Sequence, residues 1–407
     1  MFEDVEWSAQ EDETEKRVRR RVRERLGQLD GISDEELLDL IRTEISKEGK
    51  REIIPLQLRK SISYHIFNSL RKLDVLQKYI EDDDVSEIMV NGYNHIFLEK
   101  DGKVFEASSH FASEEIYEDV LQRIVGARNK IVNETMPIVD TRLEDGSRVN
   151  IVLRPIAVDG SLLTIRKFPK EPIEMETLIQ YGTLNHEVAD FLRKLVVSKY
   201  NIFVSGGTSS GKTTFLNCLT EYIPENERVV TMEDSAELQI RGVKNLVRME
   251  SRDKNLSGKN AILIRNLVKT ALRMRPDRII VGECRGEETL EMLQAFNTGH
   301  DGGMSTGHGN STEDMISRLE SMSLMAEDLP LDVIRNQIAS GIDIMIHLEK
   351  LANGSRKVSE ISEIRGVVDG KVSIERLIVY EEEKDDWNWV GRLQNTLKLK
   401  KAGEELS

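Results

Sequence analysis

Residues 202–214 read IFVSGGTSSGKTT, and this stretch decides the fold of the second half of the chain. A short apolar run, residues 202–205, predicts a buried strand. The next residues, 206–213, fit the pattern G-x-x-x-x-G-K-[ST] of a phosphate-binding loop, and a helix is expected to open at Thr213. Because strand, loop and helix occur in this order, the pattern favours a P-loop over a glycine-rich turn that holds no ligand.

The composition of this loop predicts how a nucleotide is held. Glycines let backbone N–H groups turn inward around phosphate oxygens, and the N-terminus of the next helix adds a favourable dipole. Lys212 is expected to reach the β- and γ-phosphates, and the Thr213 hydroxyl is expected to bind Mg²⁺. The predicted cofactors are therefore ATP and Mg²⁺. The expected contact residues are Gly206, Gly207, Thr208, Ser209, Ser210, Gly211, Lys212, Thr213 and Thr214.

Carboxylates follow two further apolar runs, where strand ends meet the edge of a doubly wound sheet. RVVTMEDSAEL carries Glu233, Asp234 and Glu237, and DRIIVGECRGEET carries Glu283. One carboxylate is expected to hold Mg²⁺, directly or through water, and the other to orient the attacking water. The sequence does not rank Glu233 and Glu283 for these roles, and a solvated loop carboxylate is the alternative for each. The predicted metal ligands are Thr213, Glu283, Glu233 and Asp234.

Residues 297–308 contain a glycine-rich turn between two histidines, His300 and His308. This composition indicates backbone close to a ligand, and a histidine there could sense or contact a phosphate. We expect this role for His308, with a purely structural role as the alternative. A metal site is a weak interpretation, because no third ligand has suitable spacing.

Composition limits the class of protein. The formal net charge is −15, which argues against a protein that coats nucleic acid through general positive charge. No run of about 18 apolar residues is present, and the acidic N-terminus lacks the apolar region of a secretory signal. The two cysteines, Cys218 and Cys284, cannot build a four-cysteine zinc site. A soluble, cytoplasmic protein is expected.

Changes in periodicity predict the domain organisation. We expect a RecA-like α/β P-loop domain with a mostly parallel sheet, preceded by a smaller α+β domain and an N-terminal helical region. The predicted boundaries are a charged helical region at 1–79, the α+β domain at 80–170, a linker at 171–175, the P-loop domain at 176–380 and a charged tail at 381–407.

The helical region contains a cluster of cations. Seven of the ten residues 16–25 are Lys or Arg, with Val18 and Val22 spaced for one apolar stripe on a helix. A solvated helix docked by this stripe is the favoured interpretation. Binding to an anionic membrane or an acidic partner is the alternative.

The motifs together resemble the secretion-motor ATPases of type II and type IV secretion and of type IV pili. Residues 206–213 match the Walker A loop of that family, 233–238 its Asp box, 273–289 its modified Walker B with Glu283, and 297–311 its His box. The resemblance extends over residues 80–380, about three quarters of the chain.

Several short sequence segments are similar to those of the tight-adherence (Tad) pilus branch, whose ATPases are called CpaF or TadA. They are DGSRVN at 145–150, TIRKF at 164–168, GHDGGMST at 299–306 and NGSRKV at 353–358. The absence of a four-cysteine zinc module disfavours the branches that carry one. One departure is the end of the His box, where Gly307-His308-Gly309 stands in place of an apolar residue, His and Ala.

The resemblance implies a homohexamer that binds ATP between its two domains. Arginines of the α+β domain would reach the phosphates, and the matching positions are Arg148 and Arg166, with Arg142 less certain. The expected catalytic residues are Glu233, Glu283, Lys212, Arg148, Arg166 and His308.

The resemblance also implies partners. Inner-membrane platform proteins would tether the ring to the cytoplasmic face of the cell membrane, and no sequence-specific nucleic acid is expected. Two rival functions stay open: a conjugative, DNA-translocating ATPase, and a nucleotide-binding assembly scaffold that does not hydrolyse ATP.

Overall fold

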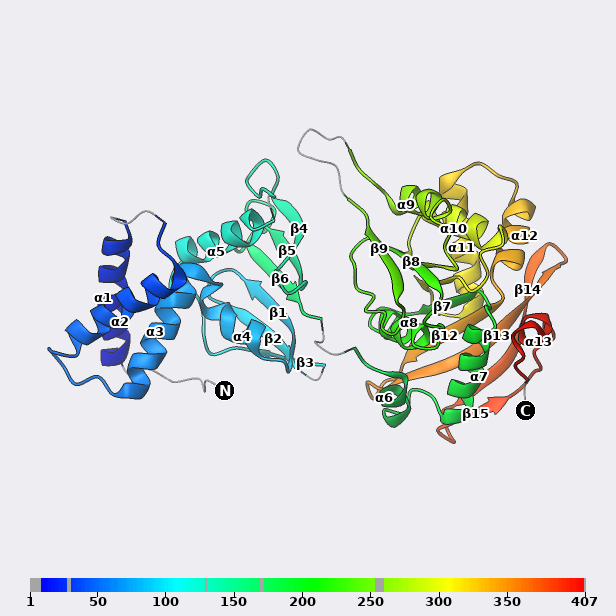
Figure 1. The fold of residues 1–407 in the computed structure, drawn as a ribbon, viewed down its shortest axis with the longest axis horizontal. Helices are drawn as coiled ribbons and strands as arrows, with labels where there is room; N and C mark the ends of the chain where they lie inside the picture. The colour runs from blue at the N-terminus through cyan, green and yellow to red at the C-terminus, as the bar shows by residue number, and fades with distance from the viewer. Residues whose placement is uncertain are drawn as a thin grey trace. The chain divides into compact units, whose positions relative to one another are not determined.

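A computed structural model describes residues 9–27, 31–100, 102–128, 130–168, 172–252 and 260–405 of the chain (Figure 1). Contacts divide the chain into two compact units, residues 1–170 and 171–407, and each is described by itself. Residues 169–171, around the start of the predicted linker, lie outside the described ranges. Within those ranges, no helix is both long and apolar enough to cross a bilayer.

The first unit begins with three packed helices: α1 (Ala9–Leu26), α2 (Asp34–Glu48) and α3 (Leu56–Arg71). Val18 and Val22 of α1 are fully buried, so the predicted stripe is the surface by which the basic helix docks. Ser33 caps α2, and its side chain and that of Glu36 make the reciprocal hydrogen bonds of a capping box. The docked-helix interpretation of residues 16–25 therefore agrees with the structure.

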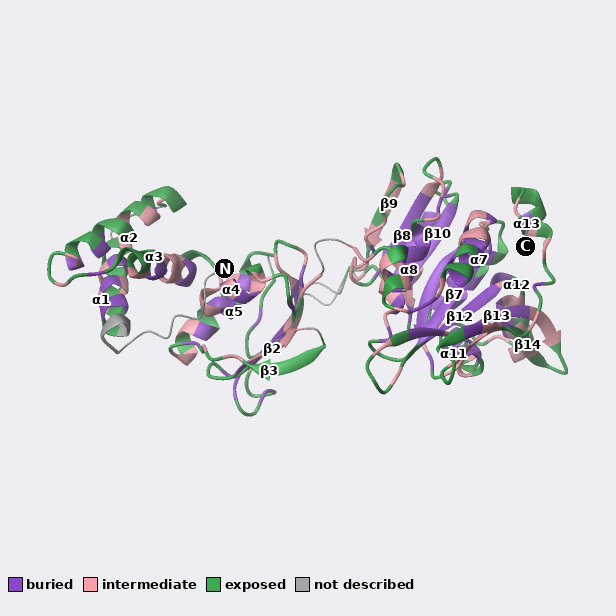
Figure 2. Cartoon of the chain, turned by 90° about the horizontal axis from the view of Figure 1, so that it is seen from below, coloured by how far each residue is buried: buried purple, intermediate pink, exposed green. Residues whose placement is uncertain are grey.

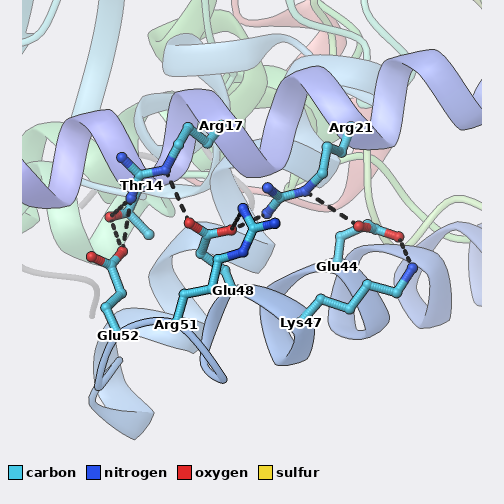
Figure 3. A network of polar contacts seen from close by, with 8 residues as sticks. All are labelled: Thr14, Arg17, Arg21, Glu44, Lys47, Glu48, Arg51 and Glu52. Carbon is cyan, nitrogen blue, oxygen red and sulfur yellow. Dashed lines mark hydrogen bonds and ion pairs between the residues drawn. The ribbon is translucent and has the colours of Figure 1, made fainter.

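Three cations of α1, Arg17, Arg21 and Arg25, pair with carboxylates of α2, and Figure 3 shows the first two of them. Arg17 Nε lies 3.0 Å from Glu48 Oε1, and Arg21 also binds Glu48. Arg25 lies 3.1 Å from Glu44, a residue that is only 2% exposed. Because these guanidinium groups satisfy buried carboxylates, they join two helices instead of forming a free basic face.

An antiparallel sheet follows, in the order β3-β2-β1-β6-β5-β4. A 3₁₀ turn η1 (Asp74–Leu76), α4 (Gln77–Glu81) and α5 (Glu114–Gly126) accompany it. Ile88, Leu163 and Val149 point to the buried face, where they pack with α5. The strands are β1 (Val85–Asn91), β2 (Ile96–Lys100), β3 (Lys103–Glu106), β4 (Ile138–Arg142), β5 (Arg148–Val152) and β6 (Leu162–Arg166).

The second unit is a sheet in the order β15-β14-β13-β12-β7-β11-β10-β8-β9. Strands β12 through β9 in this order run parallel, and the three at the other edge are antiparallel. The bounds are β7 (Ile202–Gly206), β8 (Arg228–Glu233), β9 (Asn245–Glu250), β10 (Arg278–Cys284), β11 (Met304–His308), β12 (Ile344–Lys350), β13 (Arg356–Val368), β14 (Lys371–Glu381) and β15 (Asp386–Trp389).

Helices cover both faces of this sheet, so its central strands are buried (Figure 2). Ile202 and Val204 face the cluster formed with α6–α8, whereas Phe203 faces the cluster formed with α9–α12. The helices are α6 (Met175–Gln180), α7 (His186–Val197), α8 (Lys212–Thr220), α9 (Ile264–Ala271), α10 (Glu288–Asn297), α11 (Thr312–Ala326), α12 (Leu331–Gly341) and α13 (Leu397–Ala402). The predicted fold class is confirmed: a P-loop α/β sheet follows a smaller α+β sheet and a helical region.

The end of the chain differs from the predicted charged tail. The expected boundary after residue 380 falls inside β14, and β15 pairs with β14 as an edge strand. Trp387 is 9% exposed and donates its indole N–H to the Val358 carbonyl, and Leu399 of α13 is buried. These few apolar side chains pack a mostly charged segment against the sheet. The average composition of residues 381–407 does not predict this packing.

Candidate active site

The predicted phosphate loop lies between β7 and α8, at the carboxyl end of the central parallel strand. Gly211 has a φ of 91°, and α8 begins at the next residue, one position before the predicted start. A Cβ at Gly206 would lie 2.4 Å from the Leu348 carbonyl oxygen. Ser209 has a φ of 59°, which is unusual for a residue with a side chain. The glycines are therefore required by close backbone packing and by left-handed geometry.

Lys212 is the buried cation of the loop, only 7% exposed. Its Nζ donates to the carbonyl oxygens of Gly206 and Gly207, at 3.1 and 2.8 Å, and to His308 Nδ1 at 3.2 Å. Burial lowers the pKa of Lys212, while Glu283 acts in the opposite direction. An ammonium group held this way has little solvent around it, so it is well prepared to bind phosphate oxygens.

His308 connects Lys212 to Glu283. Its Nε2 lies 2.9 Å from Glu283 Oε1, on the side of the ring opposite the Lys212 contact. Because the ammonium group can only donate, Nδ1 accepts and the ring hydrogen of a neutral His308 is on Nε2, the nitrogen nearer to Glu283. Burial, and then Lys212, lower the pKa of His308, in agreement with a neutral ring. The predicted residues Lys212, His308 and Glu283 are thus brought together.

Glu233 ends β8 and lies against β10 beside Glu283. A Cβ at Gly282 would meet Glu233 Cγ at 2.8 Å, so only glycine leaves room for this carboxylate. The backbone N–H groups of Glu237 and Leu238 donate to Oε1, at 2.8 and 2.9 Å. Oε2 is buried without a hydrogen-bond partner. Burial raises the pKa of Glu233 to about 7, against the effect of the two backbone donors.

Asp234 lies in a different setting. It is exposed, and its Oδ1 accepts a hydrogen bond from Ser251 Oγ at 3.0 Å. Within the described ranges, no three His, Cys, Asp or Glu side chains are grouped to hold a metal ion. A Mg²⁺ ion usually keeps several waters and is held by one or two protein groups with substrate phosphates. The arrangement at this loop suits that mode of binding rather than an all-protein cage.

Two arginines that the sequence motifs do not single out also bear on the site. Arg285 Nη2 donates to Glu283 Oε2 at 2.6 Å, and this hydrogen bond raises the pKa of Arg285. Arg356, at the start of β13, donates from Nε to the Ser209 carbonyl at 3.0 Å. Arg285 lies two residues after Glu283, which is a usable signal. Arg356 is 147 residues from Ser209, and only the β12–β13 pairing brings it there.

A cavity of 530 Å³ opens beside the loop. Its wall includes Gly207, Thr208 and Ser210, the start of α11, and the ends of β12 to β14. Ser210 is 2% exposed, and its hydroxyl is buried without a partner. A buried polar atom next to a turn that only glycine fits is what a loop that folds around phosphate oxygens requires.

The two histidines of the predicted His box lie at opposite ends of β11. His308 ends the strand at the loop, whereas His300 precedes the strand and contacts Thr298 at 3.3 Å. Of the two histidines, only His308 therefore lies beside the phosphate loop. At Gly302 a Cβ would lie 2.7 Å from Arg278 Nη1, so this glycine makes room for a fully buried guanidinium group.

The predicted arginines of the first unit form a row across three strands. Arg142 is opposite Arg148, and Arg148 is opposite Arg166, on the face away from the core. Arg166 is in turn opposite Glu87 of β1. The structure thus places the three predicted arginines in adjacent cross-strand positions on one face of the first unit's sheet.

Comparison with known proteins places these features in a family. The type II/IV secretion system protein family matches residues 69–386. An uncharacterised protein of Methanocaldococcus jannaschii is 36% identical over 285 residues, which are 67% of this chain but 39% of that protein. The probable conjugal transfer protein TrbB of Sinorhizobium fredii is 31% identical over 317 residues, 77% of this chain and 93% of TrbB.

A solved structure agrees on the fold. The crystal structure of the pilus retraction motor PilT with bound ADP is 19% identical, with a TM-score of 0.53, and covers 81% of this chain and 87% of PilT. At this identity the likeness shows the fold alone. The family match spans both sheets and every motif of the P-loop unit, so the resemblance is confirmed at the level of the family. The chain belongs to the type II/IV secretion system protein family.

Proposed function

We propose that the chain hydrolyses ATP in the presence of Mg²⁺ and powers a secretion or pilus-assembly machine from the cytoplasmic side of the cell membrane. Family membership supports this function. The observation that carries it is the setting of Lys212: a buried ammonium group on a P-loop, connected through His308 to Glu283. Such a constellation is typical of phosphoryl transfer to water.

Glu233 is proposed as the general base. Its unpartnered Oε2 can accept the proton of an attacking water, and a pKa near 7 suits a base that works at neutral pH. Glu283 has one oxygen 2.6 Å from Arg285 and the other 2.9 Å from His308. It is therefore proposed to act through its negative charge rather than as the base that accepts a proton. This assignment separates the two carboxylates that the sequence left unranked.

Thr213 and Glu283, with Asp234 as a further candidate, are proposed to hold Mg²⁺ directly or through water. When bound, the ion would neutralise charge on the transferred phosphoryl group. Lys212 would release the loop carbonyls and bind the β- and γ-phosphates. The His308 ring, which donates from Nε2, would keep Glu283 in position while Lys212 moves to the phosphates.

Arg148 and Arg166 are proposed to complete the site from the first unit. A guanidinium group carried on a separate rigid body reaches the phosphates only when the units close. This arrangement would couple turnover to motion of one unit against the other, and a homohexamer would supply the closing surfaces. The proposed partners are inner-membrane platform proteins of the machine.

The cargo separates two versions of this function. Motifs such as GHDGGMST at 299–306 support a Tad-type pilus motor. The similarity to the conjugal transfer protein TrbB extends over most of both proteins, and it supports a conjugative motor comparably well. Single-stranded DNA added to the ATPase assay distinguishes them: stimulation of turnover supports the conjugative version, and unchanged turnover supports the pilus version.

The proposed hydrolysis is tested by the variant Lys212→Ala. Phosphate release from Mg²⁺–ATP should fall at least ~10²-fold, because one buried charge at the transferring phosphates is lost. Lys244→Ala is the matched control, since the Lys244 side chain is 76% exposed and pairs only with Glu225. Circular dichroism checks that both variants stay folded. Wild-type turnover in Lys212→Ala, or no turnover in wild type, would reject the function and favour the scaffold alternative.

A further inference from the structure

The tip between α2 and α3, residues 47–60, carries both exposed aliphatic side chains and exposed cations. Ile53 is 96% exposed and Leu56 is 71% exposed. These two residues lie outside the family match, which begins at residue 69. The same segment carries the exposed cations Lys47, Lys50, Arg51, Arg59 and Lys60.

The outward position of Ile53 is fixed by its neighbours. Glu52 turns inward, where its carboxylate accepts hydrogen bonds from Thr14 and, at 2.9 Å, from Arg17 of α1 (Figure 3). Ile54 also turns inward and is 3% exposed in the helical core. Arg59 Nε donates to the Ile54 carbonyl at 3.0 Å, which braces the loop. With both flanking side chains held in the interior, Ile53 is held out in solvent.

The charge of the tip is strongly positive at its surface. Its only acidic residues are Glu48 and Glu52, and both are engaged by arginines of α1. The α1 arginines thus neutralise the acids of the tip. Of the tip's own cations, Lys47 pairs with Glu44 at 2.7 Å, whereas Lys50 and Lys60 are exposed. Arg51 has a side chain that is 73% exposed, and its nearest carboxylate oxygen is 3.9 Å away. Although the chain has a net charge of −15, its segment 47–60 therefore exposes several cations together with Ile53 and Leu56.

We propose that the α2–α3 tip binds directly to the surface of an anionic lipid bilayer. Ile53 and Leu56 would enter the boundary between headgroups and acyl chains, and the surrounding Lys and Arg side chains would contact lipid phosphates. Such a surface matches a bilayer, because Ile53 and Leu56, 96% and 71% exposed, would gain from an apolar phase while the nearby Lys and Arg side chains meet an anionic headgroup layer. This direct contact is distinct from tethering by platform proteins.

The test uses full-length protein and flotation with two kinds of vesicle, phosphatidylcholine alone and phosphatidylcholine with phosphatidylglycerol. Wild type should bind only the anionic vesicles, and more weakly at higher salt. The double variant Ile53→Ser/Leu56→Ser should weaken binding about tenfold or more, through lost apolar contact. Lys50→Gln/Lys60→Gln should weaken it by about fivefold for each cation removed.

Matched controls separate the tip from general effects. The apolar control, Val390→Ser/Leu397→Ser, removes two aliphatic residues outside the tip that are 58% and 66% exposed. The charge control, Arg20→Gln/Arg42→Gln, removes one cation from α1 and one from α2, whose side chains are 73% and 69% exposed. Both controls should float as wild type does, and every variant should keep its vesicle-free ATPase rate. Absence of wild-type flotation, equal binding to neutral vesicles, or equal losses in tip and control variants would overturn the proposal. If wild type instead binds an acidic polypeptide but no vesicle, the tip is a protein-docking surface and the proposal is also wrong.

Discussion

Glu233 and Glu283 end neighbouring strands but lie in different surroundings. Glu283 is 22% exposed in its side chain and contacts Arg285 and His308. Glu233 is 4% exposed and keeps one oxygen without a partner. Burial disfavours the charged form of a carboxyl group, so the local environment separates two residues of the same chemistry.

Turnover should depend on pH through Glu233. Because its pKa is raised to about 7, the proposed base is protonated and inactive at lower pH. The rate at saturating ATP should therefore rise as pH increases through about 7. Glu283→Gln should lower the rate yet keep this inflection, whereas Glu233→Gln should lose it. An inflection that survives in Glu233→Gln would assign the base elsewhere.

The ionisation of Glu233 should also affect the stability of the fold, but stability should fall with rising pH whereas turnover rises. The folded-state pKa of Glu233 lies above its ordinary value of 4.5, so its stabilising contribution is present below pH 4.5 and is lost as pH rises through about 7. At pH 8 the buried charge costs up to about 3 kcal/mol. Glu233→Gln should therefore be more stable than wild type at pH 8, by that order, and nearly equal at pH 4.5. Thermal unfolding at both pH values measures this, and a less stable variant at pH 8 would contradict it.

The sequence predicts which residues make up the candidate site, but it does not predict which of them contact one another. The P-loop, Glu233, Glu283 and His308 follow from spacing and from their places at strand ends. The pairing of Lys212 with His308 joins residues 96 positions apart, and the contact of Arg356 with Ser209 joins residues 147 positions apart. These depend on the order of strands in the sheet, which the motifs alone do not contain.

At the scale of elements, α1 and α2 are joined by charge as much as by apolar packing. Glu48 is 2% exposed, and although burial alone would raise its pKa, hydrogen bonds from Arg21 and Arg17 hold that pKa below its usual value. Its contribution to stability is therefore present above the ordinary carboxyl pKa and is lost on acidification. The sequence shows the seven cations of residues 16–25 but not the acidic partners of Arg17, Arg21 and Arg25, because Glu44 and Glu48 lie on another helix.

Glu48→Gln should loosen this helix pair. Removing the Glu48 carboxylate breaks its hydrogen bonds to Arg17 and Arg21. Because Arg17 keeps Glu52 and Arg21 keeps Glu44 as counter-charges, the loss should be about 1.5–3 kcal/mol, as for hydrogen bonds to charged groups. Hydrogen exchange of the α1 and α2 amides in the full chain should accelerate, while exchange in the P-loop unit stays unchanged. Glu24→Gln is the control, because its side chain is 66% exposed and lies 3.9 Å from Arg20. Equal protection in Glu48→Gln and Glu24→Gln would show that packing alone holds the helices.

The sequence predicts a sheet or a helical region where the hydrophobic periodicity changes. It does not predict the packing of a segment in which most residues are charged. The two sheets and the helical region follow from switches between helical and strand patterns. The segment after residue 380 is dominated by charged residues, yet β15 and α13 dock through Trp387 and Leu399. The Trp387 ring is buried and donates a hydrogen bond to the Val358 carbonyl, so this segment packs although most of its residues are charged.

At the scale of the whole molecule, the proposed site is divided between two units. The row Arg142, Arg148 and Arg166 belongs to the first unit, and the P-loop belongs to the second. Arginines supplied by a separate body act on turnover more than on nucleotide affinity, because they reach the phosphates only in the closed state. Closure within a ring would also make activity depend on assembly.

The most direct measurement is phosphate release per chain by wild type and by Arg148→Gln, over a dilution series, with ATP affinity measured in parallel. The account predicts wild-type specific activity that rises with protein concentration as rings form. In Arg148→Gln the rate at saturating ATP should fall at least ~10²-fold, with ATP affinity nearly unchanged, as for arginines that act on the transition state. Constant full activity at every dilution, with Arg148→Gln as active as wild type, would contradict a site completed by the first unit.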